Sequence, residues 1–178
     1  AVFDGIMVVD GLMAESAKGQ QEINQALEEN IIPVVVDPEW LIVTEWNPDV
    51  VIDAIIAKRN LGTRKNEAEL VIGLGPGFFA GSDVHLVIET NRGANCGRVL
   101  HAGSAEENTS SPGHVKGYAE ERVIRAPNTG VFEASVSFED LVKPGTILGR
   151  VADTPVMARI HGKVRGLIRD QRPVKQGD

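Results

Sequence analysis

The sequence is poor in thiols and has no long apolar segment. One cysteine among 178 residues cannot form a disulfide within the chain, and this usage fits a reducing cytoplasm. No apolar run approaches the ~20 residues that a membrane-spanning helix needs. The charged, apolar and small-residue segments of a signal peptide do not occur in order. We therefore expect a cytoplasmic protein with no membrane partner.

Positive charge is scarce as well. Lys and Arg number 18 against 25 Asp and Glu, so the formal net charge is -7. Non-specific binding to nucleic acid and docking on anionic membranes both need a basic face. The charge balance therefore argues against nucleic acid as a partner and again against a membrane.

The chain has room for one ordinary domain or two small ones. It opens on "AVFDGIMVVDG" without an initiator methionine, and it stops at "VKQGD" in the middle of a pattern. We interpret it as a fragment of a longer protein. Composition and periodicity divide it into an α/β part with a glycine-rich middle, residues 1 to 122, and a β module, residues 123 to 178.

Residues 1 to 60 have the pattern of an α/β structure. A short strand is predicted in "GIMVVDGLMAES" and a helix in "SAKGQQEINQALEENI", with apolar side chains at helical spacing. The β-branched run "IPVVVDP" is typical of a strand buried on both faces. Strands that alternate with a helix predict a βαβ-like parallel sheet. Lys58 and Arg59 then lie at a strand end, either as anion ligands or as solvated charges.

Residues 123 to 178 contain an internal repeat of 32 residues. The segments "APNTGVFEASVSFEDLVKPG" and "ARIHGKVRGLIRDQRPVKQG" share a glycine, alternating strand residues and V-K-x-G at a turn. Two interlocked β units of this length resemble the barrel-sandwich hybrid of biotinyl and lipoyl carrier domains. Such carriers place a modified lysine on the hairpin between the halves, but no lysine lies between Lys143 and Lys163. We therefore predict a structural or docking module rather than a carrier.

The middle of the chain is rich in glycine. Gly73, Gly75, Gly77 and Gly81 follow an apolar strand in "LVIGLGPGFFAG". Without side chains, such residues let backbone N–H groups approach an anion. The spacing matches neither the Walker A nor the Rossmann pattern, and Pro76 removes one donor. The loop is therefore either an anion cradle or a sharp turn.

Polar residues alternate along the next predicted strand, "SDVHLVIETN". Asp83, His85 and Glu89 occupy odd positions and are expected on one face. Carboxylate and imidazole together could hold a divalent metal or act as acid and base. The other interpretation is a half-exposed strand with a polar face.

The lone cysteine follows that strand. Cys96 lies between Arg92 and Arg98, and neighbouring guanidinium groups favour the thiolate form that attacks or binds metal. The other interpretation is a buried or idle cysteine in a turn, since the sequence offers no catalytic partner.

Four segments together resemble one protein family. They are "DAIIAKRNLGT", "VIGLGPGFFAGSDVHLVIETNRG", "GRVLHAGSAEENTSSPG" and "ERVIRAPNTGVF". The family is that of the selenium-dependent molybdenum hydroxylase system proteins, which are accessory proteins for such hydroxylases. The resemblance covers essentially the whole chain. It implies a role in the maturation of a molybdenum hydroxylase that carries selenium at its active site.

The resemblance also carries over individual residues. Those expected to bind the ligand are Lys58, Arg59, Asn60, Gly73, Gly75, Gly77, Gly81, Arg92 and Gly93. Two positions depart from the family pattern, because Ala94 stands where histidine is expected and Ser110 stands where glycine is expected. Cys96 is not a family signature, which argues against it as a common selenium carrier.

The sequence thus predicts an α/β part, a glycine-rich middle and a C-terminal all-β barrel-sandwich module. The leading hypothesis is a cytoplasmic accessory protein that binds a phosphate-containing ligand. That ligand would be a nucleotide part of the molybdenum cofactor or a selenium donor such as selenophosphate. The alternatives are a metal- or thiol-dependent enzyme that uses Asp83, His85, Glu89 or Cys96, and a docking scaffold for a hydroxylase subunit.

Overall fold

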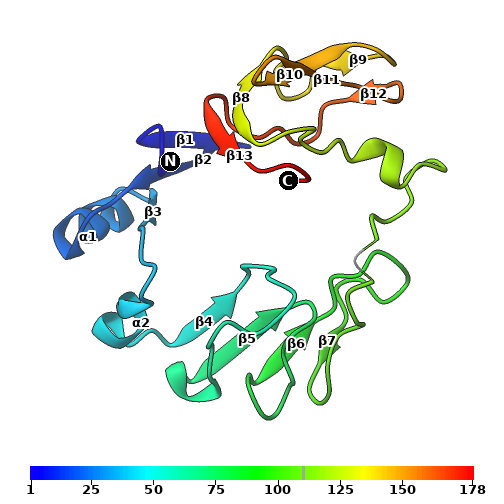
Figure 1. Cartoon of the computed structure of the whole chain (residues 1–178). Helices are drawn as coiled ribbons and strands as arrows, with labels where there is room; N and C mark the ends of the chain where they lie inside the picture. The colour runs from blue at the N-terminus through cyan, green and yellow to red at the C-terminus, as the bar shows by residue number, and fades with distance from the viewer. Residues whose placement is uncertain (110) are drawn as a thin grey trace. The chain divides into compact units, whose positions relative to one another are not determined.

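The computed structural model describes residues 1 to 109 and 111 to 178. These residues form two compact units, Ala1–Glu107 and Asn108–Asp178 (Figure 1). The first unit is an α/β structure, and it holds both α-helices of the described residues. The boundary expected after residue 122 falls inside the second unit. Ser110, one of the two positions that depart from the family pattern, lies outside the described residues.

A three-stranded sheet begins the first unit. Its strands are β1 (Ile6–Val9), β2 (Leu12–Ser16) and β3 (Ile32–Val34). β1 and β2 form an antiparallel hairpin, whose turn residues Asp10 and Gly11 both have positive φ, as a type I′ turn requires. β2 and β3 are parallel and are joined through a helix, so the predicted βαβ connection is present.

That helix is α1 (Gln20–Glu28). The apolar stripe that predicts it is buried at Ile23 and Ala26, whereas Leu27 is 53% exposed. The β-branched run after the helix forms only the short strand β3. Ile32 and Val36 in this run are 50% and 67% exposed, so the prediction of a strand buried on both faces is wrong.

A second helix, α2 (Leu41–Trp46), was not predicted from the sequence. The carboxylate of Asp37 accepts hydrogen bonds from the backbone N–H of Leu41 at 3.0 Å and of Ile42 at 2.8 Å. These two donors belong to the first turn, where the helix itself offers no acceptor. A local side-chain bond therefore starts this helix, and its Val43 reaches the core.

The second sheet follows α2. Its strands, in spatial order, are β4 (Val50–Asp53), β5 (Leu70–Leu74), β6 (Leu86–Ile88) and β7 (Val99–Leu100). The first three are parallel and β7 is antiparallel to β6. The crossover from β4 to β5 contains the short 3₁₀ helix η1 (Lys65–Glu67).

The core of the first unit lies on one face of this sheet. Val51, Val71 and Val87 point to that face and are at most 5% exposed. Phe78 and Val84 from the connection between β5 and β6 pack on them. Because the three strands are parallel, the loops that follow β4, β5 and β6 all start from the same edge of the sheet.

The regular elements among the described residues of the second unit are strands and one 3₁₀ turn. They are η2 (Glu120–Arg122), β8 (Gly130–Ala134), β9 (Leu141–Val142), β10 (Ile147–Val151), β11 (Thr154–Met157), β12 (Gly162–Lys163) and β13 (Arg172–Val174). They form a four-stranded sheet in the order β11-β10-β8-β13 and a two-stranded sheet β12-β9. The described residues do not close into a barrel.

The spacing of 32 residues recurs in the strand pairing of this unit. β8 of the first copy pairs with β13 of the second, with Gly130 opposite Val174. β12 of the second copy pairs with β9 of the first, with Gly162 opposite Val142. Each pair is the other pair shifted by 32 positions, so the two copies exchange strands.

Backbone hydrogen bonds outside the strand ladders also recur after a shift of 32 positions. The N–H of Glu139 donates to the carbonyl of Val164, and the N–H of Gln171 donates to the carbonyl of Phe132, both at 2.8 Å. Gly145 bonds to Ala158, and Gly177 bonds to Ala126, both at 2.9 Å. The second unit is therefore pseudo-symmetric at the level of single hydrogen bonds.

Among the described residues, no helix has the length and apolar content needed to cross a membrane.

Gly149→Ala should destabilise the second unit. An added Cβ would lie 2.5 Å from the carbonyl oxygen of Glu133 and 2.5 Å from the ring of Phe132, and such overpacking costs about 1–3 kcal/mol. Urea unfolding followed by circular dichroism would measure the loss. Gly166→Ala is the matched control, because nothing lies within 4 Å of its added Cβ. Equal losses in the two variants would contradict the packing argument.

Acidification should release α2 from Asp37. The backbone N–H groups of Ile42 and Leu41 lower the pKa of this carboxyl below its ordinary value of 3.8. The cap is therefore present above the ordinary pKa and is lost as the pH falls through the lowered one. An NMR titration should show the amide resonances of Leu41 and Ile42 moving together below pH 3.8. Asp37→Asn should abolish this movement, whereas Glu39→Gln should leave it in place.

Candidate functional site

The loop that leaves β4 collects positive charge. Residues 54 to 66 include Lys58, Arg59, Arg64 and Lys65 and no carboxylate. The protein as a whole carries a formal charge of -7, so this loop is a local exception. Three of the four side chains, those of Lys58, Arg59 and Arg64, have no hydrogen bond or ion pair among the described residues.

A buried carboxylate holds this loop in place. Asp53, the last residue of β4, is 3% exposed. It accepts a hydrogen bond of 2.6 Å from the hydroxyl of Thr63 and one of 3.1 Å from the N–H of Ile55. A buried carboxylate needs such donors to offset its lost hydration. The bond to Thr63 therefore brings the far end of the loop back to the sheet.

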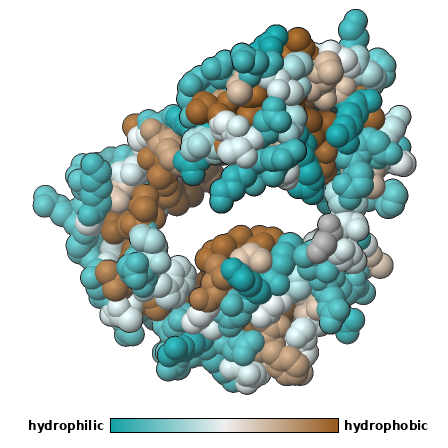
Figure 2. All heavy atoms as spheres, viewed as in Figure 1, coloured by the Kyte–Doolittle hydropathy of each residue, from teal (hydrophilic) through white to brown (hydrophobic). Residues whose placement is uncertain are grey.

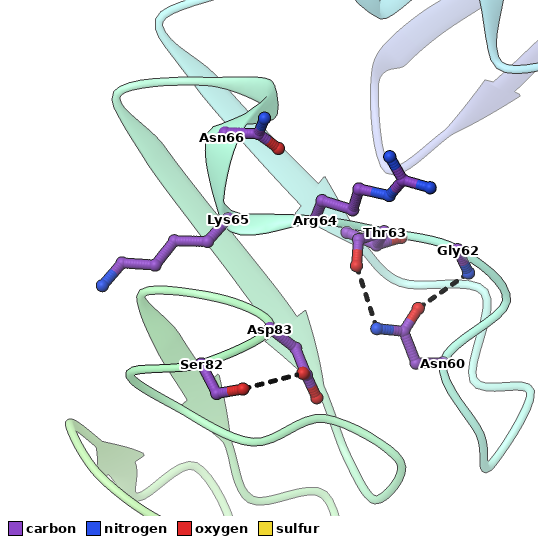
Figure 3. Close-up of a pocket in the computed structure, with 8 residues that line it drawn as sticks. All are labelled: Asn60, Gly62, Thr63, Arg64, Lys65, Asn66, Ser82 and Asp83. Carbon is purple, nitrogen blue, oxygen red and sulfur yellow. Dashed lines mark hydrogen bonds between the residues drawn. The ribbon is translucent and has the colours of Figure 1, made fainter.

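Asn60 shapes the tip of the same loop. Its side-chain oxygen accepts the N–H of Gly62 at 2.8 Å, and its side-chain nitrogen donates to the carbonyl of Thr63 at 2.9 Å (Figure 3). These bonds use both ends of the amide group. Asn60, which the resemblance singled out as a ligand, therefore has a clear structural role.

An open pocket of about 530 Å³ lies beside the loop. It is lined by Asn60, Gly62, Thr63, Arg64, Lys65, Asn66, Ser82 and Asp83. Figure 3 shows Arg64 and Lys65 extending in opposite directions from the loop, with Ser82 and Asp83 on the facing wall. The ammonium of Lys65 reaches across to the carbonyl of Gly81 at 3.3 Å.

The sequence pattern predicted only part of this pocket. Asn60 and Asp83 were candidate site residues, whereas Arg64, Lys65 and Asn66 were not. The run of 13 residues without a carboxylate, 54 to 66, was the signal that could have identified them.

The glycines at the end of β5 and in the loop after it are packed against the protein itself. A Cβ at Gly73 would overlap the ring of Phe78, and one at Gly75 would lie 2.5 Å from the hydroxyl of Thr90. A Cβ at Gly77 would lie 2.5 Å from Cα of Arg59. The loops after β4, β5 and β6 therefore meet, as the parallel sheet predicts, and close backbone approach accounts for these glycines.

Several amides of the glycine-rich loop are used inside the protein. The N–H of Gly75 donates to the carbonyl of Ile88, and the N–H of Gly81 donates to the carbonyl of Val84, both at 2.8 Å. The N–H of Phe79 donates to the carboxylate of Asp83 at 2.9 Å. The predicted cradle of glycine amides therefore lacks two of its donors, and Gly81 alone of the four glycines has open space around its Cβ position.

The polar residues around β6 make separate contacts. Asp83 caps the turn before the strand, and the Nδ1 atom of His85 accepts the N–H of Val71 at 2.9 Å. An Nδ1 that accepts a bond leaves the ring hydrogen on Nε2 in the neutral imidazole. Glu89 is 4% exposed and accepts the N–H groups of Asn91 and Glu106, both at 2.7 Å.

These contacts bear on the hypothesis of a metal site. Within the described part of the chain, no three His, Cys, Asp or Glu side chains are grouped so that they could hold a metal ion. Asp83, His85 and Glu89 each bond to a different stretch of backbone. Acid or base chemistry by these residues stays a prediction.

The loop after β6 is exposed. Arg92, Gly93 and Cys96 lie in it, and the N–H of Cys96 donates to the carbonyl of Gly93 at 3.3 Å. The side chains of Asn91 and Asn95 donate to Glu106 and lower the pKa of its carboxyl. Among the described residues, no hydrogen bond or ion pair engages the guanidinium of Arg92.

Comparison with known proteins gives one similar sequence. The chain is 46% identical over 177 residues to a protein of Escherichia coli (strain K12) described as uncharacterized protein YqeB. That alignment covers 99% of this chain and 33% of the relative, so the chain spans about a third of the relative's length. No family model and no solved structure matches.

Thr63→Val should destabilise the first unit by releasing the loop of residues 54 to 66 from the sheet. It removes the donor at 2.6 Å from the buried Asp53, and leaving a buried carboxylate short of a partner costs about 1–3 kcal/mol. The free energy of unfolding in urea would measure this loss. Thr63→Ser keeps the hydroxyl and should lose clearly less. If both variants lose the same amount, the hydroxyl is not what holds the loop.

Proposed function

We propose that this chain is an accessory module that binds a phosphate-containing ligand on the loop of residues 54 to 66. The module would act in the maturation of a selenium-dependent molybdenum hydroxylase, in the cytoplasm. One observation carries the binding proposal: four cations without a carboxylate gather on this loop in a protein of net charge -7. The four sequence segments that resemble the hydroxylase system family support the biological role.

The chemistry of the pocket suits an anion that also offers donors. Arg64 presents a planar guanidinium without a partner among the described residues, and such a group pairs with two phosphate oxygens at once. Lys65 adds a compact charge on the other side of the loop (Figure 3). The carboxylate of Asp83 on the facing wall repels a bare anion and accepts hydroxyl or amino groups. This combination favours a nucleotide part of the molybdenum cofactor over selenophosphate.

The second unit would be the docking part of the module. We propose that it is a barrel-sandwich hybrid, which the strand exchange between its two copies supports. The tip of its β10–β11 hairpin is Ala152 and Asp153, so no amine is present there for biotin or lipoate. A hydroxylase subunit is the partner that the family resemblance implies.

Replacing both pocket cations should weaken anion binding. Isothermal titration with ADP should give a dissociation constant at least about 10-fold weaker for Arg64→Ala/Lys65→Ala than for the parent, because charge-assisted bonds to phosphate are lost. Inorganic phosphate, as a second probe, should bind the parent more weakly than ADP does. Binding should weaken as salt is raised, since the cations are exposed.

Two control variants identify the source of the binding energy. Arg165→Ala removes an exposed arginine that pairs with Glu139 in the second unit, and it should leave the affinity unchanged. Arg92→Ala tests the cradle expected at the glycine-rich loop, Gly73 to Gly81, to which Arg92 was expected to contribute a cation. If Arg92→Ala weakens ADP binding and the double variant does not, the ligand binds at the glycine-rich loop after β5 and not on the loop of residues 54 to 66.

The biological part of the proposal has its own test. In cells that lack the gene, the parent protein should restore the activity of a selenium-dependent molybdenum hydroxylase, and the Arg64→Ala/Lys65→Ala variant should not. Normal hydroxylase activity in the deletion strain would overturn the maturation role while leaving anion binding intact.

A further inference from the structure

The pseudo-symmetry of the second unit is broken at one place. β8 lies between two strands, β10 and β13. Its counterpart 32 positions later is β12, which among the described residues pairs with β9 alone. The strand that would correspond to β10 on the free side of β12 is not supplied by residues 1 to 178, because its positions would be 179 to 183.

The space for such a strand is open. A Cβ at Gly130 would meet Cγ1 of Val151 at 3.2 Å and the backbone nitrogen of Ala152 at 3.5 Å. Gly162 is the counterpart of Gly130, and nothing lies within 4 Å of its Cβ position. The glycine that begins the strand thus faces β10 in one copy and open space in the other.

A backbone donor is left over on the same side. The N–H of Ser135, just after β8, donates to the carbonyl of Leu148 in β10 at 3.0 Å. Its counterpart, the N–H of Leu167, has no acceptor among the described residues. Leu167 itself packs against the core of the unit. A backbone N–H without an acceptor, on a residue that packs against the core, indicates that the sheet is incomplete at this edge.

The turn that precedes β10 recurs at the end of the chain, where the corresponding strand would begin. Before β10, the N–H of Thr146 donates to the carbonyl of Lys143 at 2.9 Å, and the N–H of Lys143 donates to the Thr146 hydroxyl at 3.1 Å. The same two bonds recur at the counterparts, where Asp178 bonds to Lys175 at 3.1 Å and Lys175 bonds to the Asp178 carboxylate at 2.7 Å.

We propose that a β-strand of the same polypeptide, starting directly after Asp178, occupies the free side of residues 162 to 167. The repeated turn points the chain into this slot without a linker. The relative from E. coli has about two thirds of its length outside the aligned region. A related polypeptide therefore contains further residues that could form such a strand. Pseudo-symmetry also predicts which side chain of the new strand is buried. Val151, the fifth residue of β10, is fully buried, and its counterpart is the fifth residue of the new strand. The fifth residue of the new strand is therefore apolar and packs on Gly162.

Hydrogen exchange tests the proposal. The chain of residues 1 to 178 is compared with the polypeptide lengthened by the residues that its gene encodes after Asp178. The Leu167 amide should exchange at least about 10-fold more slowly in the longer polypeptide. The Ser135 amide is the internal reference, because it is already bonded to Leu148 and should be unchanged. Equal exchange at Leu167 in both proteins would overturn the proposal.

A packing variant gives an independent readout. Gly162→Val should leave the melting temperature of residues 1 to 178 unchanged, since its side chain enters open space. In the longer polypeptide the same substitution should lower the melting temperature, because the new strand then meets it. A second copy of the chain could also fill the slot. In that case protection at Leu167 would rise with protein concentration, and the same-chain proposal would fail.

Discussion

The bond between the Thr63 hydroxyl and the buried Asp53 carboxylate fixes the part of the molecule that is proposed to bind a ligand. It joins the end of β4 to a residue ten positions later at 2.6 Å, so the intervening loop must turn back over the sheet. Asn60 then sets the tip of the loop through two short bonds to Gly62 and Thr63. A flexible run of four cations would lose more conformational entropy on binding an anion than this anchored loop does.

The glycine-rich segment shows how a glycine pattern can have two physical causes. A ligand that approaches the backbone and a neighbouring loop that approaches the backbone both exclude a Cβ. Here Gly77 faces the backbone of Arg59 and Gly75 faces Thr90. The sequence cannot distinguish these cases, because the occupying atoms come from distant loops. The glycines therefore support the site by letting three loops meet at one sheet edge.

Local and repeated features were the ones that the sequence predicted well. The α1 stripe of Ile23 and Ala26 and the 32-residue repeat depend on spacing alone. The helix α2 was missed because a preceding side chain, Asp37, starts it. The pocket was missed because it forms where Ser82 and Asp83 lie across from the loop after β4. Such proximity follows from strand order, which sequence periodicity does not specify.

The exchange of strands between the two copies governs how the second unit can be synthesised. The carbonyl of Phe132 lacks its Gln171 donor, and the N–H of Ala126 lacks its Asp178 acceptor, until those later residues are present. Neither copy can complete its ladder while the other is still inside the ribosome, so this unit cannot fold progressively from its N-terminus. Contacts this far apart in sequence also predict slow folding relative to a meander of neighbouring strands. A nascent chain stalled before residue 171 would leave the side of β8 that pairs with β13 unpaired, and such an edge invites aggregation.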